Sequence, residues 1–153
     1  MMQEFLTKNA TETQKLAGDI VKELMSRISA KTAAVLALQG ELGAGKTTFV
    51  QGLAETLGVK EKITSPTFVI LRHFKIDPGF MLQASSLYHI DCYRLDKPEE
   101  LLELGLDEIL KDPKNLVVIE WADKVKSIIP QDAVWVEFEW MGEEDRKINI
   151  NNA

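Results

Sequence analysis

The sequence predicts an α/β fold in which helices cover a mainly parallel central sheet. Two near-continuous apolar runs have the length of strands, Ala33–Gln39 and Leu116–Ile119, and a glycine-rich turn directly follows the first. Such runs suit parallel strands that are covered on both faces. Segments with helical character alternate with the strand-like ones, which is typical of α/β proteins. We therefore expect one domain over residues 1–153.

The start of the chain predicts an edge strand followed by an amphipathic helix. Gln3–Thr7 has the length of a short edge strand. The residues after it are candidate N-caps, because their side chains can accept from free backbone N–H groups: Asn9, Thr11 and Thr13. Apolar residues then recur at intervals of four, which indicates a helix with one face on the core: Leu16, Ile20, Leu24 and Ile28.

The glycine-rich turn is expected to lead into a second helix and then a strand. Thr47–Leu57 has helical character, and Gly58 is suited to end it. Lys60–Thr67 is polar and contains a proline, which predicts a loop, and Phe68–Phe74 alternates as a strand does.

The second half of the chain predicts two more strands, two short helices and a terminal hairpin. Leu87–Asp91 is a short strand ending in an acid, and a helical signature begins at Asp96. A second short helix follows at Leu106–Leu110. Ala133–Trp140 and Arg146–Ile150 resemble the two strands of an antiparallel hairpin.

The composition excludes several classes of protein. The chain has 24 acidic and 18 basic residues and a net charge of −6, which argues against strong direct binding to nucleic acid. Its lone cysteine, Cys92, cannot form an internal disulfide. No apolar run approaches the length of a membrane span, and the start lacks the pattern of a secretion signal. We expect a cytoplasmic protein.

The strongest motif is the phosphate-binding pattern G-x-x-x-x-G-K-[ST] at Gly40–Thr47. Its glycines let backbone N–H groups approach phosphate oxygens, Lys46 can reach the β- and γ-phosphates, and the Thr47 hydroxyl can ligate Mg²⁺. Because a buried strand precedes it and a helix follows, the motif predicts the three-layer P-loop NTPase fold, with a nucleoside triphosphate and Mg²⁺ as ligands. A glycine-rich turn without a ligand is the alternative. The expected nucleotide contacts are Glu41, Leu42, Gly43, Ala44, Gly45, Lys46, Thr47 and Thr48.

Two acids are candidates for the metal shell and the attacking water. Asp91 and Glu120 each directly follow a predicted strand, and ligands of α/β sheets bind at the carboxyl ends of the strands. A P-loop site needs one acid near Mg²⁺ and a group that orients water. We expect catalysis to involve Asp91, Glu120 and Lys46, and the metal to be held by Thr47 and Glu120. The roles of the two acids are interchangeable at this stage, and each acid alone also fits a helix cap.

A polar segment after the P-loop helix is a candidate switch. Thr64, Ser65 and Thr67 carry hydroxyl groups that can close over a γ-phosphate and release it after hydrolysis. A simple polar turn around Pro66 is the alternative. His89 is expected to hydrogen-bond locally and to orient the Asp91 strand.

Several short motifs in one order closely resemble the bacterial TsaE (YjeE) family over roughly residues 9 to 140. The combination of SPTF, HxDxYRL and EW is more discriminating than the glycine-rich motif alone. The segments that carry the resemblance are Gly40–Thr48 (GELGAGKTT), Ser65–Phe68 (SPTF), His89–Leu95 (HIDCYRL), Pro98–Leu101 (PEEL), Glu103–Gly105 (ELG) and Ile119–Trp121 (IEW).

The resemblance implies a function in tRNA modification. Members of that family are ATPases required for N6-threonylcarbamoyladenosine at position 37 of tRNAs that read ANN codons. They bind the TsaD–TsaB complex and meet tRNA only through it. The resemblance implies that Trp121 lies beside the nucleotide and that Asn9–Thr13 lies near the adenine. One departure is Lys75–Ser86, which is longer than the usual connection in relatives and is a surface loop or an added partner contact.

Two other functions stay open from the sequence. Arginines are sparse, and no segment resembles an arginine-rich lid, so we expect slow ATP turnover by the isolated protein. Arg94 either acts in cis on the phosphates or pairs with an acid. The alternatives are a small-molecule kinase, which the missing basic lid disfavours, and a scaffold that binds nucleotide without hydrolysis, which Asp91 and Glu120 disfavour.

Overall fold

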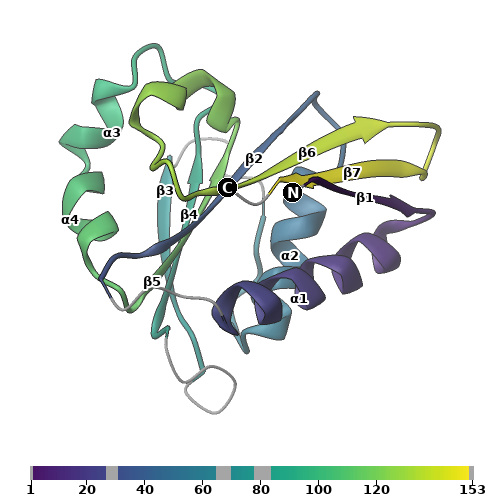
Figure 1. Cartoon of the computed structure of the whole chain (residues 1–153), viewed down its shortest axis with the longest axis horizontal. Helices are drawn as coiled ribbons and strands as arrows, with labels where there is room; N and C mark the ends of the chain where they lie inside the picture. The colour runs from purple at the N-terminus through teal and green to yellow at the C-terminus, as the bar shows by residue number, and fades with distance from the viewer. Residues whose placement is uncertain (1, 27–30, 65–69, 78–83, 152–153) are drawn as a thin grey trace.

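The structure is a computed structural model, and it describes residues 2–26, 31–64, 70–77 and 84–151. Seven strands form one sheet in the order β1-β7-β6-β2-β5-β4-β3 (Figure 1). The elements are β1 (Met2–Thr7), α1 (Ala10–Ser26), β2 (Ala34–Gly40), α2 (Lys46–Thr56), β3 (Leu71–Lys75), β4 (Ser86–Asp91), α3 (Glu99–Glu103), α4 (Leu106–Lys111), β5 (Asn115–Glu120), the 3₁₀ helix η1 (Ala122–Ile128), β6 (Val134–Trp140) and β7 (Arg146–Asn151).

The sheet is parallel in the middle and antiparallel at both edges. Strand β2 pairs in parallel with β5 and with β6, and β5 pairs in parallel with β4. At one edge β3 is antiparallel to β4; at the other, β6, β7 and β1 form an antiparallel set. The predicted α/β class, the terminal hairpin and the edge strand at the start of the chain are confirmed.

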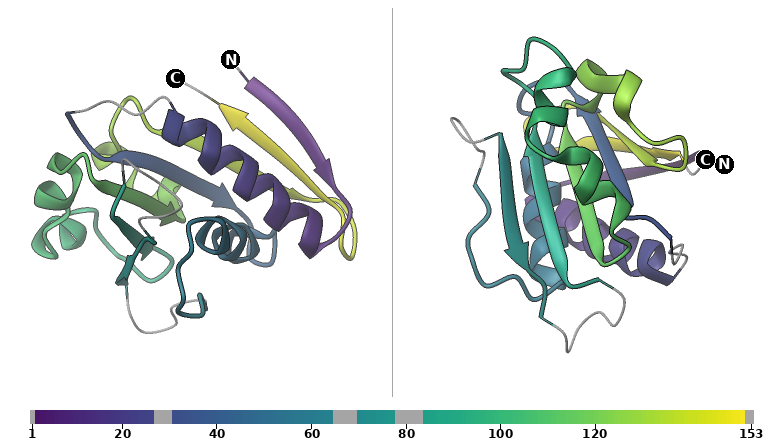
Figure 2. Two further views of the ribbon diagram at one scale, coloured as in Figure 1. Left: turned by 90° about the horizontal axis from the view of Figure 1, so that it is seen from below. Right: turned by 90° about the vertical axis from the view of Figure 1, so that its left-hand side faces the viewer.

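Helices cover the sheet on two sides and make three layers. Helices α1 and α2 pack on one face, whereas α3, α4 and η1 lie on the other, as the two turned views show (Figure 2). Alternate residues of the central strands serve the two cores: Leu36 and Leu38 face α1 and α2, while Val35 and Ala37 face the other layer. This alternation explains why β2 reads as a continuous apolar run, since both of its faces are buried.

Helix α1 begins where the sequence places it. The Glu12 N–H donates to Oδ1 of Asn9 at 2.8 Å, so Asn9 is the cap among the three candidates. The expected stripe is buried at Ile20 and partly buried at Leu16 and Leu24. Ile28 lies outside the described residues.

Two local predictions need correction, and one helix was not predicted. The strand expected from Phe68 begins at Leu71 in the described part of the chain, and Phe68 itself lies outside it. The helix expected from Asp96 begins at Glu99, because Pro98 disfavours helical geometry at the residue before it. There the Glu100 carboxylate accepts from the N–H groups of Asp96 and Lys97, at 2.9 and 3.1 Å. The 3₁₀ helix η1 was not expected at all.

The parallel strands bring several chain segments to one edge of the sheet. Strands β2, β4 and β5 end there at Gly40, Asp91 and Glu120, and β6 ends at the same edge in the turn to β7. The start of α1 joins them, since Thr7 pairs with Arg146 at the start of β7. A functional site at this edge can therefore draw on five separate segments.

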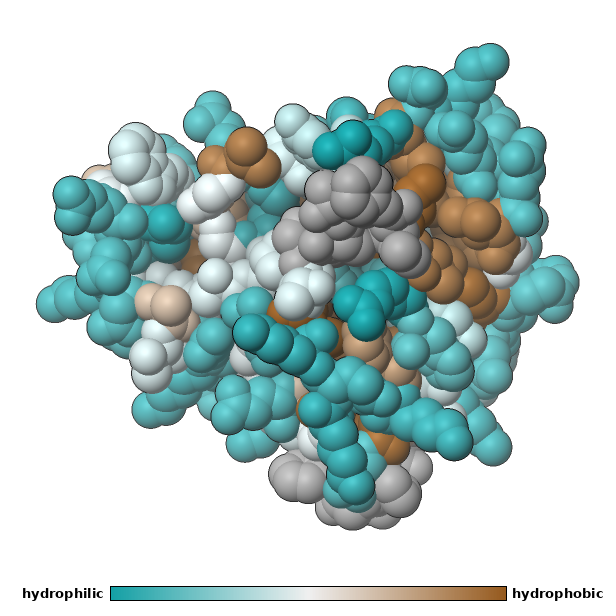
Figure 3. Space-filling model, turned by 180° about the vertical axis from the view of Figure 1, so that it is seen from behind, coloured by the Kyte–Doolittle hydropathy of each residue, from teal (hydrophilic) through white to brown (hydrophobic). Residues whose placement is uncertain are grey.

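The face seen from behind is mainly polar, with apolar groups gathered in a few patches (Figure 3). Among the described helices, none has the length and apolar character that crossing a membrane requires.

We predict that Gly52→Ala destabilises the fold by about 1–3 kcal/mol. Alanine normally favours a helix by up to about 1 kcal/mol over glycine. However, a Cβ on Gly52 would lie 2.4 Å from Cα and from the backbone oxygen of Gln14, where α1 crosses α2. Urea unfolding measures the change. Gly142→Ala is the control, because a Cβ there meets no atom closer than 3.9 Å. A more stable Gly52→Ala variant would contradict this packing.

Candidate functional site

The loop between β2 and α2 turns through glycines in left-handed conformations. Gly43 has φ 80° and Gly45 has φ 106°, values that residues with a Cβ rarely adopt. Helix α2 begins directly after Gly45, at Lys46. The first N–H groups of a helix have no acceptor within the helix, so this turn presents donors and the positive end of the helix dipole to an anion.

Lys46 is held at this turn by the backbone. Its ammonium donates to the carbonyl oxygens of Gly40 and Glu41, at 2.5 and 2.9 Å, and lies 4.1 Å from the ring centre of Trp121. Burial lowers the pKa of Lys46, and the nearby charges of Glu120 and Asp91 oppose that shift. A cation at the mouth of an anion-binding turn is suited to phosphate.

Glu120 at the end of β5 faces the start of α2. The Thr47 hydroxyl donates to its carboxylate, 3.1 Å from Oε1 and 3.4 Å from Oε2. Glu120 is only 2% exposed. The pair therefore gathers a hydroxyl and carboxylate oxygens, the ligand type that Mg²⁺ prefers.

Asp91 at the end of β4 lies beside Glu120. The two residues are register partners, so their side chains lie on the same face of the sheet. Oδ1 of Asp91 accepts from the N–H of Tyr93 at 2.9 Å. Burial, together with the negative charge of Glu120, raises the pKa of Asp91, while the Tyr93 hydrogen bond lowers it. A carboxylate with a raised pKa is a better proton acceptor than an ordinary one.

Trp121 has the only left-handed backbone among the described non-glycine residues, with φ 57°. Such a conformation costs on the order of 1 kcal/mol for a residue with a side chain. It turns the chain out of β5 and places the indole in contact with Lys46 and with Tyr93. The ring centres of Trp121 and Tyr93 are 5.0 Å apart. The strain is therefore tied to the placement of an aromatic ring at the pocket.

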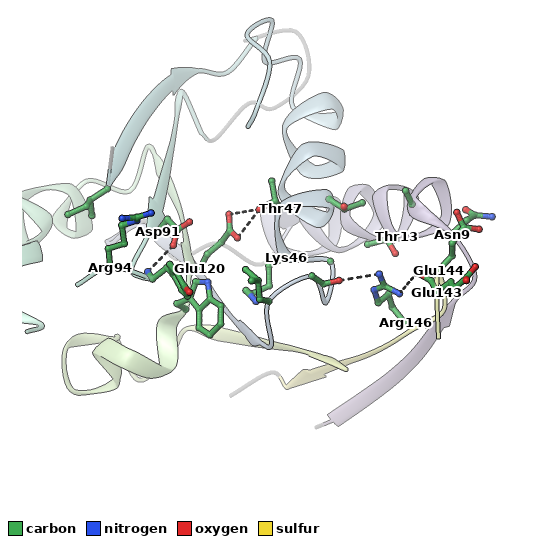
Figure 4. A pocket seen from close by; sticks show the side chains of 18 residues that line it. Asn9, Thr13, Lys46, Thr47, Asp91, Arg94, Glu120, Glu143, Glu144 and Arg146 are labelled. Carbon is green, nitrogen blue, oxygen red and sulfur yellow. Dashed lines mark hydrogen bonds between the residues drawn. The ribbon is translucent and has the colours of Figure 1, made fainter. Parts of the chain in front are cut away.

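These groups line one pocket of about 610 Å³. In the close-up, Lys46 and Thr47 lie in its middle, Asp91, Arg94 and Glu120 at one end, and α1 with the β6–β7 turn at the other (Figure 4). The described residues that line this second end are Asn9, Ala10, Thr13, Glu143, Glu144 and Arg146. A ligand with an anionic group on the turn can thus extend in either direction.

Most of the predicted site residues come together here. Of the expected contacts, Leu42, Gly43, Gly45, Lys46, Thr47, Thr48, Asp91, Glu120 and Trp121 line the pocket. Two described loop residues, Glu41 and Ala44, do not: Ala44 is buried and its N–H donates to the Glu41 carbonyl.

The predicted switch cannot be compared with the structure as a whole. Thr64 is exposed and is not among the described residues that line the pocket. Ser65 and Thr67 lie outside the described residues. The switch stays a prediction, as does the role of Lys75–Ser86, of which residues 78–83 lie outside the description.

Sequence reasoning missed Arg146 as a site residue. Its Nη2 donates to the carbonyl oxygen of Gly43 at 3.1 Å, across 103 positions of sequence. Its Nη1 donates to three carbonyl oxygens of the β6–β7 turn, those of Gly142, Glu143 and Asp145, at 3.2, 3.3 and 2.9 Å. One guanidinium therefore fastens the turn to the glycine-rich loop, and no local sequence pattern signals such a contact.

We expect Arg146→Ala to weaken nucleotide binding about tenfold, since one charge-assisted hydrogen bond contributes roughly 1.5–3 kcal/mol. Without the Arg146 guanidinium, Gly43 loses its hydrogen bond to the β6–β7 turn. Calorimetric titration with an ATP analogue measures the change. Lys147→Ala is the matched control, because Lys147 points to the opposite face of β7, toward Glu4 and Glu139. Equal affinities for the two variants would contradict a role for Arg146.

The fold and the pocket define a class before any relative is considered. A parallel strand that enters a G-x-x-x-x-G-K-T turn and a helix, with acids on the neighbouring strands, defines the P-loop nucleotide-binding proteins. The family model described as "Threonylcarbamoyl adenosine biosynthesis protein TsaE" matches residues 7–148. The chain belongs to the TsaE family, which confirms the resemblance seen in the sequence.

Individual relatives agree with this membership. The chain is 35% identical to the tRNA threonylcarbamoyladenosine biosynthesis protein TsaE of Bacillus subtilis, covering 94% of this chain and 82% of that protein. It is also 35% identical to the TsaE of Treponema pallidum, covering 95% and 97%. Among solved structures it is similar to Bacillus subtilis YdiB, with a TM-score of 0.73, 30% identity and coverage of 99% of this chain and 86% of that one.

Proposed function

We propose that this chain binds ATP with Mg²⁺ and hydrolyses it slowly, in support of tRNA threonylcarbamoyladenosine formation. One observation carries the proposal: Lys46 and Thr47 at the start of α2 share a pocket with Asp91 and Glu120 at the ends of β4 and β5. This combines a cation and helix N–H groups for phosphate with two carboxylates for metal and water. Membership of the TsaE family supports the same reading.

The geometry favours one division of roles between the acids. Glu120 contacts the Thr47 hydroxyl, so we assign it, with Thr47, to the metal shell. Asp91 has one oxygen occupied by the Tyr93 N–H, and its raised pKa suits a group that orients or deprotonates the attacking water. Lys46 would hold the β- and γ-phosphates in line with that water.

The chemistry of the donors fits Mg²⁺ bound together with a nucleotide. No group of three or more acidic, histidine or cysteine side chains suited to a metal occurs among the described residues. Mg²⁺ typically takes only one or two protein ligands and completes its shell with phosphate and water. When bound, it would offset the charge that develops on the phosphates.

The described pocket supports slow turnover by the protein alone. Arg94 lines the end of the pocket that holds Asp91 and Glu120. At the other end, Arg146 donates hydrogen bonds to backbone carbonyl oxygens. An arginine positioned on the transferred phosphate is worth 10³–10⁵ in rate in P-loop enzymes. We propose that a partner speeds hydrolysis by repositioning Arg94 or by adding a cation of its own.

The relatives' names supply the biological context. They are called tRNA threonylcarbamoyladenosine biosynthesis proteins, and we propose the same pathway for this chain. We further propose TsaD and TsaB as its partners, with tRNAs that read ANN codons reached only through them, in the cytoplasm. The net charge of −6 supports indirect rather than direct contact with tRNA.

Phosphate release and tRNA modification test the proposal together. The purified chain with Mg²⁺ and ATP should release phosphate slowly, and faster when TsaD and TsaB are added. Adding it to those partners, together with a source of the threonylcarbamoyl group, should sustain multiple turnovers of tRNA modification. Release at tens per second without partners would contradict the proposal. Transfer of phosphate to a small acceptor would favour a kinase, and binding without release under any condition would favour a scaffold.

A further inference from the structure

His89 is a buried polar side chain that the proposed reaction does not use. It is 0% exposed and lies on β4, two residues before Asp91. Its register partner on β5 is Val118, two residues before Glu120. Because side chains of a strand alternate between faces, His89, Asp91 and Glu120 lie on the same face, with His89 one step deeper below the pocket.

The ring of His89 makes a short contact with Glu120. Nε2 of His89 lies 2.5 Å from Oε2 of Glu120. A carboxylate that binds a metal ion can only accept, so in the proposed metal-bound state Nε2 is the donor of this bond. The other oxygen of Glu120 lies 3.1 Å from the Thr47 hydroxyl. Glu120 is thus held from below by His89 and from the side by Thr47.

Among the described residues, Glu120 is the hydrogen-bond partner of the His89 ring, and the second ring nitrogen has none. Nδ1 is buried and has no hydrogen-bond partner among the residues that the structure describes. The described neighbours on this face include the apolar Leu87 and Val118, while Arg72 is the register partner of His89 on β3. A buried imidazole that uses only one nitrogen for hydrogen bonds to the described residues is an expensive choice for core packing, where an aliphatic residue carries no such penalty. Its value must therefore lie in the bond to Glu120.

We propose that His89 is a positioning residue that sets the orientation of the Glu120 carboxylate for the metal shell. This inference rests on the proposed Mg²⁺–nucleotide function. Buried partners that hydrogen-bond to a metal-binding carboxylate fix its orientation, and their loss typically costs 10–100-fold in metal affinity. In this chain the bond leaves Glu120 one defined rotamer next to Thr47, so little ordering is needed when metal and nucleotide arrive.

A matched pair of substitutions isolates the hydrogen bond from the volume. In His89→Gln the amide nitrogen stands as many bonds from Cα as Nε2 does, so the donor is kept. His89→Met has a similar length and volume without a donor. Cooperative thermal unfolding of both variants establishes that each is folded.

The readout is the Mg²⁺ dependence of nucleotide binding, not hydrolysis. The β,γ-imido analogue of ATP is titrated calorimetrically at Mg²⁺ concentrations from zero, with EDTA, to saturation. We expect His89→Met to raise the Mg²⁺ concentration for half-maximal effect about tenfold, and His89→Gln to stay within about threefold of the parent. Without Mg²⁺ all three proteins should bind the analogue equally.

A second comparison tests whether the effect passes through Glu120, and His89→Leu, which also lacks a donor, replaces His89→Met in both comparisons if the latter is poorly folded. In a Glu120→Gln background, replacing His89 with Gln or with Met should give the same Mg²⁺ dependence, because the bond's carboxylate is gone. Equal Mg²⁺ dependence of the two variants in the parent background overturns the inference, as does an equal loss of Mg²⁺-free binding. If the parent binds the analogue without any response to Mg²⁺, the proposed function fails, and the role of His89 fails with it.

Discussion

Replacing Lys46 with alanine is expected to reduce ATP hydrolysis by roughly 10²–10³-fold. The ammonium lies at the start of α2, held by the carbonyl oxygens of Gly40 and Glu41 and covered by Trp121. From there it can hold phosphate oxygens through charge-assisted hydrogen bonds, which are about twice as strong as neutral ones. Phosphate release at Mg²⁺ and ATP concentrations that saturate the parent measures the effect.

Two variants make this result specific. Lys62→Ala removes an exposed lysine that is not among the residues lining this pocket, so it should leave the rate unchanged. Lys46→Arg keeps the charge but not the compact ammonium, so we expect only partial activity. Hydrolysis by Lys46→Ala at the parent rate would mean that the phosphates do not bind at this turn.

Replacing Asp91 with asparagine is expected to lower hydrolysis by about 10²–10⁴-fold while nucleotide binding is retained. Asparagine can still accept the Tyr93 N–H, so the local backbone is preserved. What is lost is the carboxylate that we propose orients or deprotonates the attacking water. Binding should not weaken, because the substitution removes a negative charge near the phosphates.

The same substitution should raise stability at neutral pH. The pKa of Asp91 is raised above its ordinary value of 3.8, mainly by burial. A carboxyl group with a raised pKa in the folded state favours folding below its unfolded pKa, and this contribution is lost as pH rises through the folded pKa. At pH 7 the parent therefore carries a destabilising buried charge that Asp91→Asn removes.

Urea unfolding at two pH values measures how the stability difference between Asp91→Asn and the parent depends on pH. The advantage of Asp91→Asn over the parent should be largest near pH 7 and shrink as the pH falls toward 4. The exposed Asp132→Asn serves as the control and should show no such trend. An advantage that grows as the pH falls would contradict a raised pKa for Asp91.

Much of the fold could be predicted because its central signals are local. The apolar run of β2 and the glycine motif after it required a buried strand entering a helix, and the structure has both. The edges were harder. The boundaries of β3 and α3 depend on pairing with β4 and on Pro98. The 3₁₀ helix η1 follows a left-handed Trp121, a conformation that a non-glycine sequence does not signal.

In the candidate site, too, the residues that follow local signals could be predicted, and those that depend on tertiary contacts could not. Asp91 and Glu120 could be paired in advance, because both follow strands and the carboxyl ends of parallel strands meet at one edge. The far end of the pocket could not be predicted, since Arg146 reaches Gly43 only once β7 lies beside β1 and β6. The bond from His89 to Glu120 likewise depends on the register of β4 and β5, which the sequence does not state.

The central claim is that a triphosphate is held where β2 passes into α2. Calorimetric titration of the protein with ATP analogue and Mg²⁺ tests it most directly, with the parent and Lys46→Ala measured side by side. We predict a saturable, one-to-one heat of binding for the parent and its loss in Lys46→Ala. The same heat in both proteins, or none in the parent, would contradict the claim.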